Sequence, residues 1–494
     1  MQYSDSQRGI GRGEIAESRV EVPFIAAFMV ICAAALLVIH SRYESGSVTI
    51  ALAVSMIVFG VTVVRVDLGV YILVAAMLLS PEIDFGTEST GERNLNVRYD
   101  DVLIIVIFLG VLVKLAFEGK QHFWRPSPIN SGIVSYYFIC IVSTLFALRM
   151  NLASWDRTDA FFVLLKMAEF YMVFFLVGSA IRDLNDVRRQ LTFFFVVALI
   201  VCGYCMATVG RVERIGTPFE AQGSEPNTLG GYLIVVMCAA GGLYTQSPKR
   251  GLSWVFVLLM AAAFVPFLFT LSRASYIGLI VAALALGIMA RKLSIILAVA
   301  AILILSPILM PPEVKDRVNY TFQRGTGDPV VIAGKPIGLQ VDSSTHERLY
   351  VWGKVKYTLG VAPWFGGGIS WGKVLDSQYA RVIMETGLLG LGAFVFLQYR
   401  ICRTAREAFR WSHHWLGRGL AMGTLAATIG LITHSLGTIS FLIIRIMEPY
   451  WFLVALTVVV RAIAIEEHAA ALRDQKVAQP LRKIALQSQG VSAG

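Results

Sequence analysis

Arginine side chains recur at the ends of the apolar stretches of this sequence. A guanidinium group holds phosphate oxygens through two parallel hydrogen bonds, so arginines gathered on one surface can bind a phosphate or a diphosphate. Carboxylates among them could take up a proton as a general base. Each arginine alone is typical of an interfacial charge, but together they predict a phosphate site. The residues placed in this way are Arg98, Arg211, Arg214 and Arg273, with Asn227 in the polar segment between the last two.

A second set of polar residues lies inside apolar stretches. Lys166 and Glu169 are three residues apart, as are Arg445 and Glu448, and His434 lies in the apolar stretch before them. Charges inside a membrane-spanning helix are costly and often mark a functional site. The alternative for the lysine and its glutamate is mutual neutralisation across one helical turn, and for the histidine a hydrogen bond between helices. Both interpretations stay open, and all five are candidate substrate-binding residues.

The segment 366–392, "GGGISWGKVLDSQYARVIMETGLLGLG", carries charges at the start of an apolar helix. Arg381 and Glu385 are four residues apart, which favours a structural ion pair at a helix start. Asp376, just before that helix, is a candidate general base. The sequence contains no Walker motif, no H-E-x-x-H and no credible metal-binding constellation, so we expect neither a metal nor a cofactor.

The elements that must position these residues are membrane helices. Of the 494 residues, 56% are hydrophobic and only 15% are charged, whereas about a quarter of the residues in soluble proteins are charged. Runs of roughly 17–25 apolar residues, which span about 30 Å of hydrocarbon, recur along the chain. We therefore expect an all-α polytopic membrane protein with about 12–14 transmembrane helices. The predicted spans lie near 22–40, 46–64, 67–81, 101–117, 130–148, 158–181, 190–209, 227–245, 252–270, 274–290, 293–310, 378–399, 419–437 and 441–461.

Basic residues in alternate connections orient the helices. Connections such as 182–189 and 400–418 are rich in arginine, whereas the connections between them carry fewer basic residues. Because basic loops stay in the cytoplasm, residues 1–21 and 462–494 are predicted to be cytoplasmic tails. The formal net charge of +10 then reflects topology and contact with membrane lipids rather than nucleic-acid binding. On this orientation the candidate residues lie towards the outer face.

One long polar segment, 311–377, separates the spans at 22–310 from those at 378–461. The topology puts this loop of roughly 67 residues outside, and loops of such length are usually functional. Within it, Ser344 followed by Glu347 is a capping box and predicts the start of a helix.

This loop helix is predicted to run to about Leu359 and to end at Gly360. Arg348, Trp352 and Lys356 recur along it at intervals of four residues, so they share one face. His346 is the only histidine in the loop.

Several segments match a known family in order. "RVERIGTPFEAQGSEPNTLGGYL" combines arginines with a Pro-Asn loop, and "TLSRASYIGLIVAALALGIMA" opens a late span with Ser-Arg. "HERLYVWGKVKYTLGVAPWFGGGI" and "DSQYARVIMETGLLGLGAF" contain Arg-x3-Trp, a glycine-rich turn, a short polar motif and the next helix. Together these segments, about residues 211–395, resemble the O-antigen ligase/polymerase (Wzy/WaaL) superfamily. "NVRYDDVLIIV" is also similar to a segment of its exopolysaccharide polymerases.

The resemblance implies a GT-C-like fold and a metal-independent inverting glycosyltransferase. It implies undecaprenyl-diphosphate-linked glycans as donor and acceptor, used at the periplasmic face of the bacterial inner membrane. It also implies partner proteins that regulate chain length and export the polymer. Carried over to this sequence, it places Arg211 or Arg214, Arg273 and Arg348 near the lipid diphosphate, with His346 and Trp352 as further candidates for substrate binding.

One departure from the family distinguishes between its activities. Ligases usually carry a histidine motif just before the helix that follows the loop, whereas this sequence reads Asp376, Ser377, Gln378 and Tyr379 there. We therefore expect a polysaccharide polymerase, with Asp376 as the catalytic base and Arg273 and Arg348 as catalytic arginines. The alternatives are an O-antigen ligase that transfers glycan to lipid A core and, from another class, a flippase for lipid-linked oligosaccharides.

Overall fold

The computed structural model describes most of the chain, in two compact units. Unit 1 contains Met1–Arg125 and Phe175–Ala180, and unit 2 contains Pro126–Phe174 and Ile181–Gly494. The predicted span 22–40 and the candidate base Asp376 lie outside the described residues. The residues that the structure describes are 46–81, 98–118, 126–150, 155–211, 214–219, 225–309, 329–332, 335–340, 343–371 and 377–491.

The described part of unit 1 contains three helices that pack through small residues. Thr62 is fully buried where they meet, because Gly69 and Gly110 lack the side chain that would press against it. Lys114 donates a hydrogen bond of 2.7 Å to the carbonyl of Val64 and so caps the end of the first helix. The helices are α2 (Gly46–Val64), α3 (Val66–Leu79) and α4 (Tyr99–Glu118).

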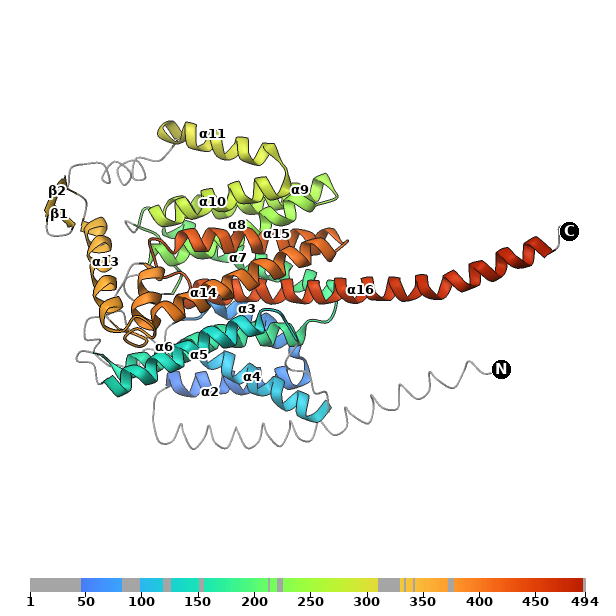
Figure 1. Cartoon of the computed structure of the whole chain (residues 1–494), viewed down its shortest axis with the longest axis horizontal. Coiled ribbons are helices and arrows are strands. Elements are labelled where there is room, and N and C mark those ends of the chain that lie inside the picture. The colour runs from blue at the N-terminus through green and yellow to red at the C-terminus, as the bar shows by residue number, and fades with distance from the viewer. Residues whose placement is uncertain are drawn as a thin grey trace. The chain divides into compact units, whose positions relative to one another are not determined.

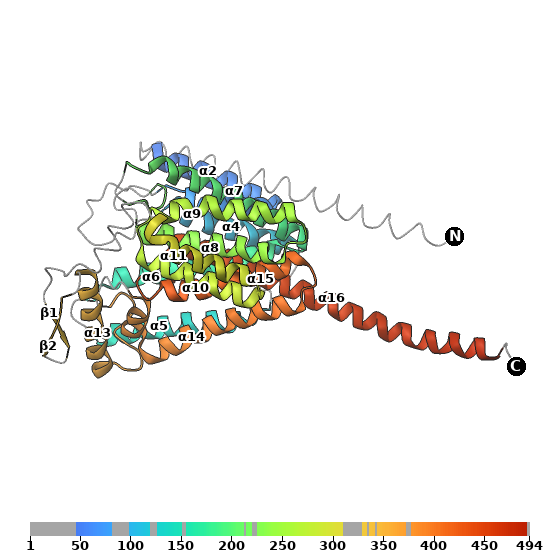
Figure 2. The same ribbon diagram turned by 90° about the horizontal axis from the view of Figure 1, so that it is seen from above.

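Unit 2 holds most of the described helices, with α8 at its centre (Figures 1 and 2). Almost all of α8 is buried, and it packs against α9, α10, α15 and α16. The approach to α15 is closest where a side chain on Gly242 would overlap the backbone of Gly419 and Gly423. Such small residues let membrane helices associate closely. The elements of unit 2 are α5 (Asn130–Met150), α6 (Arg157–Ala180, whose last residues belong to unit 1), α7 (Leu184–Thr208), α8 (Pro226–Gln246), α9 (Arg250–Leu268), α10 (Arg273–Ala290), α11 (Leu293–Leu309), β1 (Pro329–Ile332), β2 (Lys335–Gln340), α13 (Ser343–Val361), α14 (Gln378–Trp411), α15 (Trp415–His434) and α16 (Ile444–Val491).

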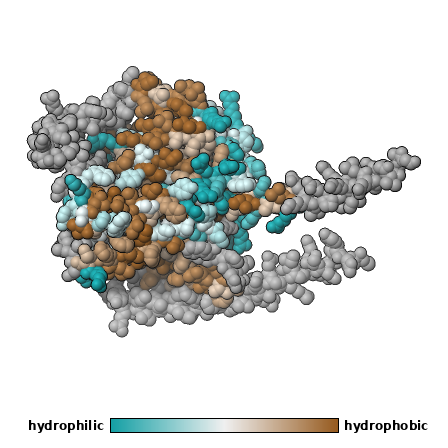
Figure 3. Space-filling view, viewed as in Figure 1, coloured by the Kyte–Doolittle hydropathy of each residue, from teal (hydrophilic) through white to brown (hydrophobic). Residues whose placement is uncertain are grey.

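The surface of these helices identifies the class of protein. Among the described residues, nine helices are long and apolar enough to cross a membrane. Large hydrophobic side chains such as Leu258, Ile277 and Val395 are exposed on their flanks. Figure 3 shows hydrophobic side chains over the visible flanks. Hydrophilic side chains gather near the end at which the C-terminal part of α16 projects beyond the other helices. Because such an apolar surface is unfavourable in water, the chain is a multi-pass, almost entirely helical membrane protein.

The predicted spans agree with the helices from 46–64 onwards. Two helices extend well past the predicted ends, because α14 continues to Trp411 and α16 to Val491. The added segments are rich in charged residues, so a search for apolar runs ends too early. Within the predicted loop 311–377, α13 begins one residue before the predicted capping box. The antiparallel hairpin of β1 and β2, in which Ile332 pairs with Lys335, was not predicted.

Helix α13 lies across one end of the other helices of unit 2 (Figures 1 and 2). Val351 and Val355 on one of its faces pack against Ala380, Ile383 and Met384 at the start of α14. The loop helix is therefore fixed to the beginning of the next predicted span. We call this end of unit 2 the polar end, defined by the first residues of α8, α10, α14 and α16 and the last residues of α15.

Candidate functional site

A continuous chain of hydrogen bonds joins the helices at the polar end. Ser272 Oγ donates to Asn227 Oδ1 at 2.7 Å, and Ser275 Oγ donates to Ser272 Oγ at 2.7 Å. The next link is His434, whose Nε2 lies 3.0 Å from Ser275 Oγ and whose Nδ1 lies 2.7 Å from Ser440 Oγ. His434 is fully buried. We call these five residues the serine–histidine chain; it connects α8, α10, α15 and the segment before α16.

The number of hydrogens that each group carries sets the direction of the hydrogen bonds in this chain. Each serine hydroxyl has one hydrogen to donate. Because Ser272 donates to Asn227 and Ser275 donates to Ser272, the imidazole must donate its Nε2 hydrogen to Ser275. The Nδ1 atom of His434 is then the acceptor for Ser440. With a neutral histidine that carries its hydrogen on Nε2, each of the four hydrogen bonds of the chain has one donor and one acceptor.

Three glycines make room for the chain. A side chain on Gly230 would overlap Ser275 Oγ, and one on Gly231 would lie 3.3 Å from the His434 ring. On the facing helix, a side chain on Gly278 would lie 3.2 Å from His434 Cβ. The segments "NTLGGYL" and "SRASYIGL" therefore supply both the polar groups and the space in which they meet.

The segment 435–443, which links α15 to α16, extends the network to the start of α14. We call it the connector. The backbone N–H of Gln378 lies 3.1 Å from the carbonyl of Ser435 and 3.2 Å from that of Thr438. The Gln378 side chain, fully buried, accepts a hydrogen bond of 3.1 Å from the N–H of Phe441. The connector thus holds the first residues of α14, directly after the position of Asp376.

The start of α10 carries Arg273. Ser272 is its N-cap and accepts a hydrogen bond from the Ser275 N–H at 3.2 Å. Arg273 follows at the first helical position and is half-buried. An arginine beside a helix N-terminus combines a guanidinium group with the positive end of the helix dipole, an arrangement suited to an anion.

The other predicted outer arginines differ from one another in environment. Arg214 donates to the carbonyls of Thr270 and Leu271 at 3.3 and 3.4 Å, so it closes the turn between α9 and α10. That contact places Arg214 close to Arg273 in the fold, but gives it a structural task. Arg211, in the turn after α7, is exposed.

Helix α14 is broken at Gly387, whose φ of 66° and ψ of −163° are not helical. The glycine-rich turn of residues 363–371 supplies partners for the backbone groups released by the break. Gly367 and Gly368 donate to the carbonyls of Met384 and Glu385 at 2.8 and 2.9 Å, and Leu388 donates to a carbonyl of the turn at 2.9 Å. Broken helices at membrane depth require such internal partners. Two of the three glycines of the sequence motif, Gly367 and Gly368, thus pair with the backbone of α14 beside its break.

Glu385 fastens the turn to the helix. Its carboxylate accepts hydrogen bonds from Arg381 Nε at 2.8 Å and from the Ser370 N–H at 2.9 Å. The carboxylate is buried, with 3% of the residue exposed. The predicted ion pair between Arg381 and Glu385 is confirmed, and its partner in the turn explains why a charge is kept at this helix start.

The charged pair of α6 lies deeper in unit 2. Lys166 Nζ and Glu169 Oε2 are 3.3 Å apart and both residues are buried, so the predicted pairing across one turn is confirmed. One turn further along α6, Phe170 and Tyr171 contact the ring of Trp451 in α16, with ring centroids 6.5 and 5.0 Å apart.

Arg445 and Glu448 in α16 are also buried. Glu448 precedes Trp451 by one turn, and the Trp451 ring contacts aromatic side chains of α6, so the charged residues of α6 and α16 lie near one another along the helices. Arg445 also donates to the carbonyl of Pro218. The hydrogen bonds of His434 go instead to serines, which favours the prediction of a histidine that joins helices.

The predicted face of the loop helix is only partly described. Trp352 is 48% exposed and Lys356 is exposed, whereas Val351 and Val355 form the face towards α14. His346 and Arg348 belong to the first turns of α13, and their side chains lie outside the described part of the structure. Their predicted role in the site is therefore untested by geometry.

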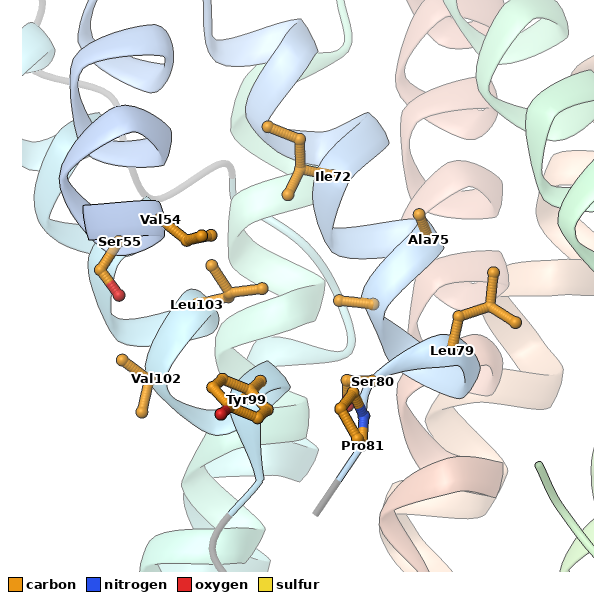
Figure 4. A pocket seen from close by; sticks show the side chains of 11 residues that line it. Val54, Ser55, Ile72, Ala75, Leu79, Ser80, Pro81, Tyr99, Val102 and Leu103 are labelled. Carbon is orange, nitrogen blue, oxygen red and sulfur yellow. The ribbon is translucent and has the colours of Figure 1, made fainter. Parts of the chain in front are cut away.

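In unit 1, Arg98 is engaged within its own helix start. Its guanidinium group lies 3.1 Å from Asp100, and its backbone N–H donates to Asp101 at 2.8 Å. Only 7% of Arg98 is exposed. It adjoins Ser80 and Tyr99, which line a mainly apolar pocket of about 490 Å³ (Figure 4). The ion pair gives Arg98 a structural role, and its predicted role in binding substrate stays a prediction.

Unit 2 contains an apolar cavity of about 470 Å³ lined by α8, α9, α10 and α11. Towards the polar end it is lined by Phe267, Leu268 and Tyr276, the last being three residues beyond Arg273. The Tyr276 hydroxyl donates to the Leu268 carbonyl at 2.5 Å. An apolar space thus begins one helical turn below the candidate anion site.

Within the described residues, no cluster of three or more histidine, cysteine, aspartate or glutamate side chains could hold a metal ion. In comparisons with known proteins, no family model matches the chain, and no curated protein matches it either. The geometry of the polar end is therefore the basis on which a function can be proposed.

Proposed function

We propose that this membrane protein is a polysaccharide polymerase of the bacterial inner membrane. It would join undecaprenyl-diphosphate-linked repeat units at the periplasmic face. The observation that carries the proposal is the meeting, at one end of unit 2, of the Arg273-bearing start of α10 with the start of α14. The serine–histidine chain and the connector join the two. The start of α10 suits a diphosphate, and the start of α14 follows the candidate base Asp376 in the sequence.

The diphosphate fits the start of α10 on electrostatic grounds. Arg273 is half-buried at the first helical position, where a guanidinium group and the helix dipole act on the same anion. Partial burial strengthens such an interaction, because the effective dielectric constant is lower than in water.

The lipid part of the donor fits the apolar cavity below. Its wall at Tyr276 lies one turn from Arg273. An isoprenoid chain there would have its diphosphate at the helix start, so one amphiphile would satisfy both features. This arrangement supports a polyprenyl-diphosphate donor over a soluble nucleotide sugar.

The reaction would proceed by direct displacement. A hydroxyl oxygen of the acceptor sugar forms a bond to the anomeric carbon of the donor glycan, while the bond from that carbon to the diphosphate oxygen breaks. The bonding electrons leave with undecaprenyl diphosphate, whose charge Arg273 and Arg348 stabilise. Asp376 takes the proton of the attacking hydroxyl. The polymer grows by one repeat unit, and one molecule of undecaprenyl diphosphate is released.

Three variants test these assignments. In purified protein, Arg273→Ala, Arg348→Ala and Asp376→Asn are each expected to slow polymer formation by about 10²–10³, the loss typical of removing one transition-state donor. Arg250→Ala, an exposed arginine at the opposite end of α9, serves as the control and should polymerise normally. Normal polymer from all three variants, at normal protein levels, would overturn the site assignment.

The same preparation separates the rival functions. A ligase would attach finished glycan to a lipid A core acceptor without elongating it, and deletion of its gene would leave polymer made but unattached. A flippase would move lipid-linked glycan across vesicles and produce no longer chains. In detergent no membrane separates two compartments, so transport cannot be observed. Elongation under these conditions is expected only of the polymerase.

A further inference from the structure

We infer that His434 is a positioning residue, which fixes the position of the start of α10 relative to the start of α14. The inference rests on the proposed function, in which those starts carry Arg273 and follow Asp376. In the described contacts, the side chain of His434 bonds serines and no arginine. It acts through Ser275 on one side and Ser440 on the other.

The first arm of His434 leads to Arg273. Nε2 donates to Ser275, and Ser275 donates to Ser272. Ser272 is the N-cap of α10, so its position fixes the first helical residue, which is Arg273. Asn227 anchors the far end of this arm to α8.

The second arm leads to α14. Nδ1 accepts a hydrogen bond from Ser440, which lies in the connector. Phe441, the next residue, donates to the side chain of Gln378. Gln378 is the first residue of α14, so the second arm fixes the start of α14, which follows Asp376 by two residues in the sequence.

The chemistry of the chain requires a side chain that donates on one side and accepts on the other. Imidazole does both across a rigid ring, and the glycines at 230, 231 and 278 leave space for it and for Ser275. Glutamine can place an amide donor near the Nε2 position. Alanine can supply neither group and leaves the Ser275 hydroxyl and the Ser440 hydroxyl without their shared partner.

Full burial also separates positioning from base catalysis. His434 has no exposed surface, and both ring nitrogens are bonded to serine hydroxyls. An acceptor sugar hydroxyl would have to displace one of these serines to reach it. The pH dependence of the rate should therefore keep its shape when His434 is replaced.

The experiment measures kcat and KM for elongation by purified protein with an undecaprenyl-diphosphate-linked repeat unit. His434→Ala is expected to lower kcat by about 10², the loss that a shift of about 1 Å in catalytic groups can produce, with little change in KM. Ser275→Ala should lower kcat in the same way. His434→Gln should recover the part of the loss that is due to the first arm. Thr433→Ala, whose hydroxyl donates to the Ile429 carbonyl of its own helix, is the matched control and should behave as wild type.

A double variant tests whether His434 acts through Arg273. If it does, Arg273→Ala with His434→Ala should be slower than Arg273→Ala by clearly less than the loss that His434→Ala causes alone, because the group positioned by the first arm is already absent while the second arm still acts. Losses that multiply in full would show that the first arm does not act through Arg273 and would overturn the inference.

Three further outcomes would count against it. Activity of His434→Ala that falls only in proportion to the folded fraction, measured by thermal unfolding in detergent, would reduce the residue to a structural one. Loss of one limb of the pH profile would make it a base. Near-normal kcat for both His434→Ala and Ser275→Ala, with Arg273→Ala inactive, would remove positioning but leave the proposed function in place. Failure of wild type to elongate glycan would instead contradict the function.

Discussion

The starts of α10 and α14 lie at the same end of unit 2 but are held by different means. The start of α10 is held by neutral groups, namely two serine hydroxyls, an asparagine amide and the His434 ring. The start of α14 is held by the connector and, in addition, by a charge and by backbone pairing, because Glu385 pairs with Arg381 and the glycine-rich turn covers the break at Gly387.

The difference indicates which region tolerates change. Removing one neutral hydrogen bond usually costs about 0.5–1.5 kcal/mol of stability, whereas removing one partner of a buried ion pair costs about 3–5 kcal/mol. Variants near Gly387 should therefore break the fold. Variants in the serine–histidine chain should alter activity while the protein stays folded.

The largest effect is expected for Gly387→Ala. Its backbone angles lie in a region open almost only to glycine, which costs about 1–3 kcal/mol for other residues, and the new side chain would overlap the backbone of Trp364. We expect little or no folded protein by size-exclusion chromatography in detergent. Gly392→Ala, a position with open space around it in the same helix, should yield normal protein. Equal yields of both variants would contradict the described break.

A smaller loss is expected for Glu385→Gln. The change leaves the Arg381 charge beside a neutral amide at a buried position, and we expect a loss of stability of about 3 kcal/mol. The control is Arg403→Ala, which removes a pair of the same spacing in the same helix, with the arginine side chain 54% exposed. Exposed pairs contribute at most about 1 kcal/mol. Comparable thermal unfolding of the two variants would show that burial of Glu385 has no energetic effect.

The smallest change in stability is expected for Ser440→Ala. It removes one hydroxyl and leaves Nδ1 of His434 without its donor, a cost of about 1–2 kcal/mol. The rate of elongation should fall by more than the folded fraction does, since the arm towards α14 is lost. Activity and folded fraction are measured on the same sample. A parallel decline of the two would place Ser440 with Glu385 rather than with the chain.

Much of the fold follows from sequence because apolar length determines it. The spans from 46–64 onwards and the ion pairs Lys166–Glu169 and Arg381–Glu385 depend on local spacing, and local spacing is visible in a sequence. The other members of the serine–histidine chain come from three separate segments, so no spacing rule finds them. The one signal available was the concentration of small residues in "NTLGGYL" and "SRASYIGL". The break at Gly387 was hidden for the same reason, because its partners lie in the turn 363–371.

The candidate site divides along the same line. The sequence singled out Arg273, Asn227 and His434 separately, and the fold brings them to one end of unit 2. The substrate-binding roles of Arg98 and Arg214 stay predictions; in the fold Arg98 pairs with Asp100, two residues away, and Arg214 donates to the distant carbonyl of Thr270. A charged residue in an apolar stretch therefore indicates that burying its charge costs free energy. The fold is needed to identify the partner that compensates for this cost.

The most direct test of the central claim is elongation by the purified wild-type protein. It would be incubated in detergent with an undecaprenyl-diphosphate-linked repeat unit, without nucleotide sugar, and the products separated by size. We predict a ladder of products that differ by one repeat unit, together with released undecaprenyl diphosphate. A single unchanged repeat unit, from protein shown to be folded, would contradict the proposed polymerase.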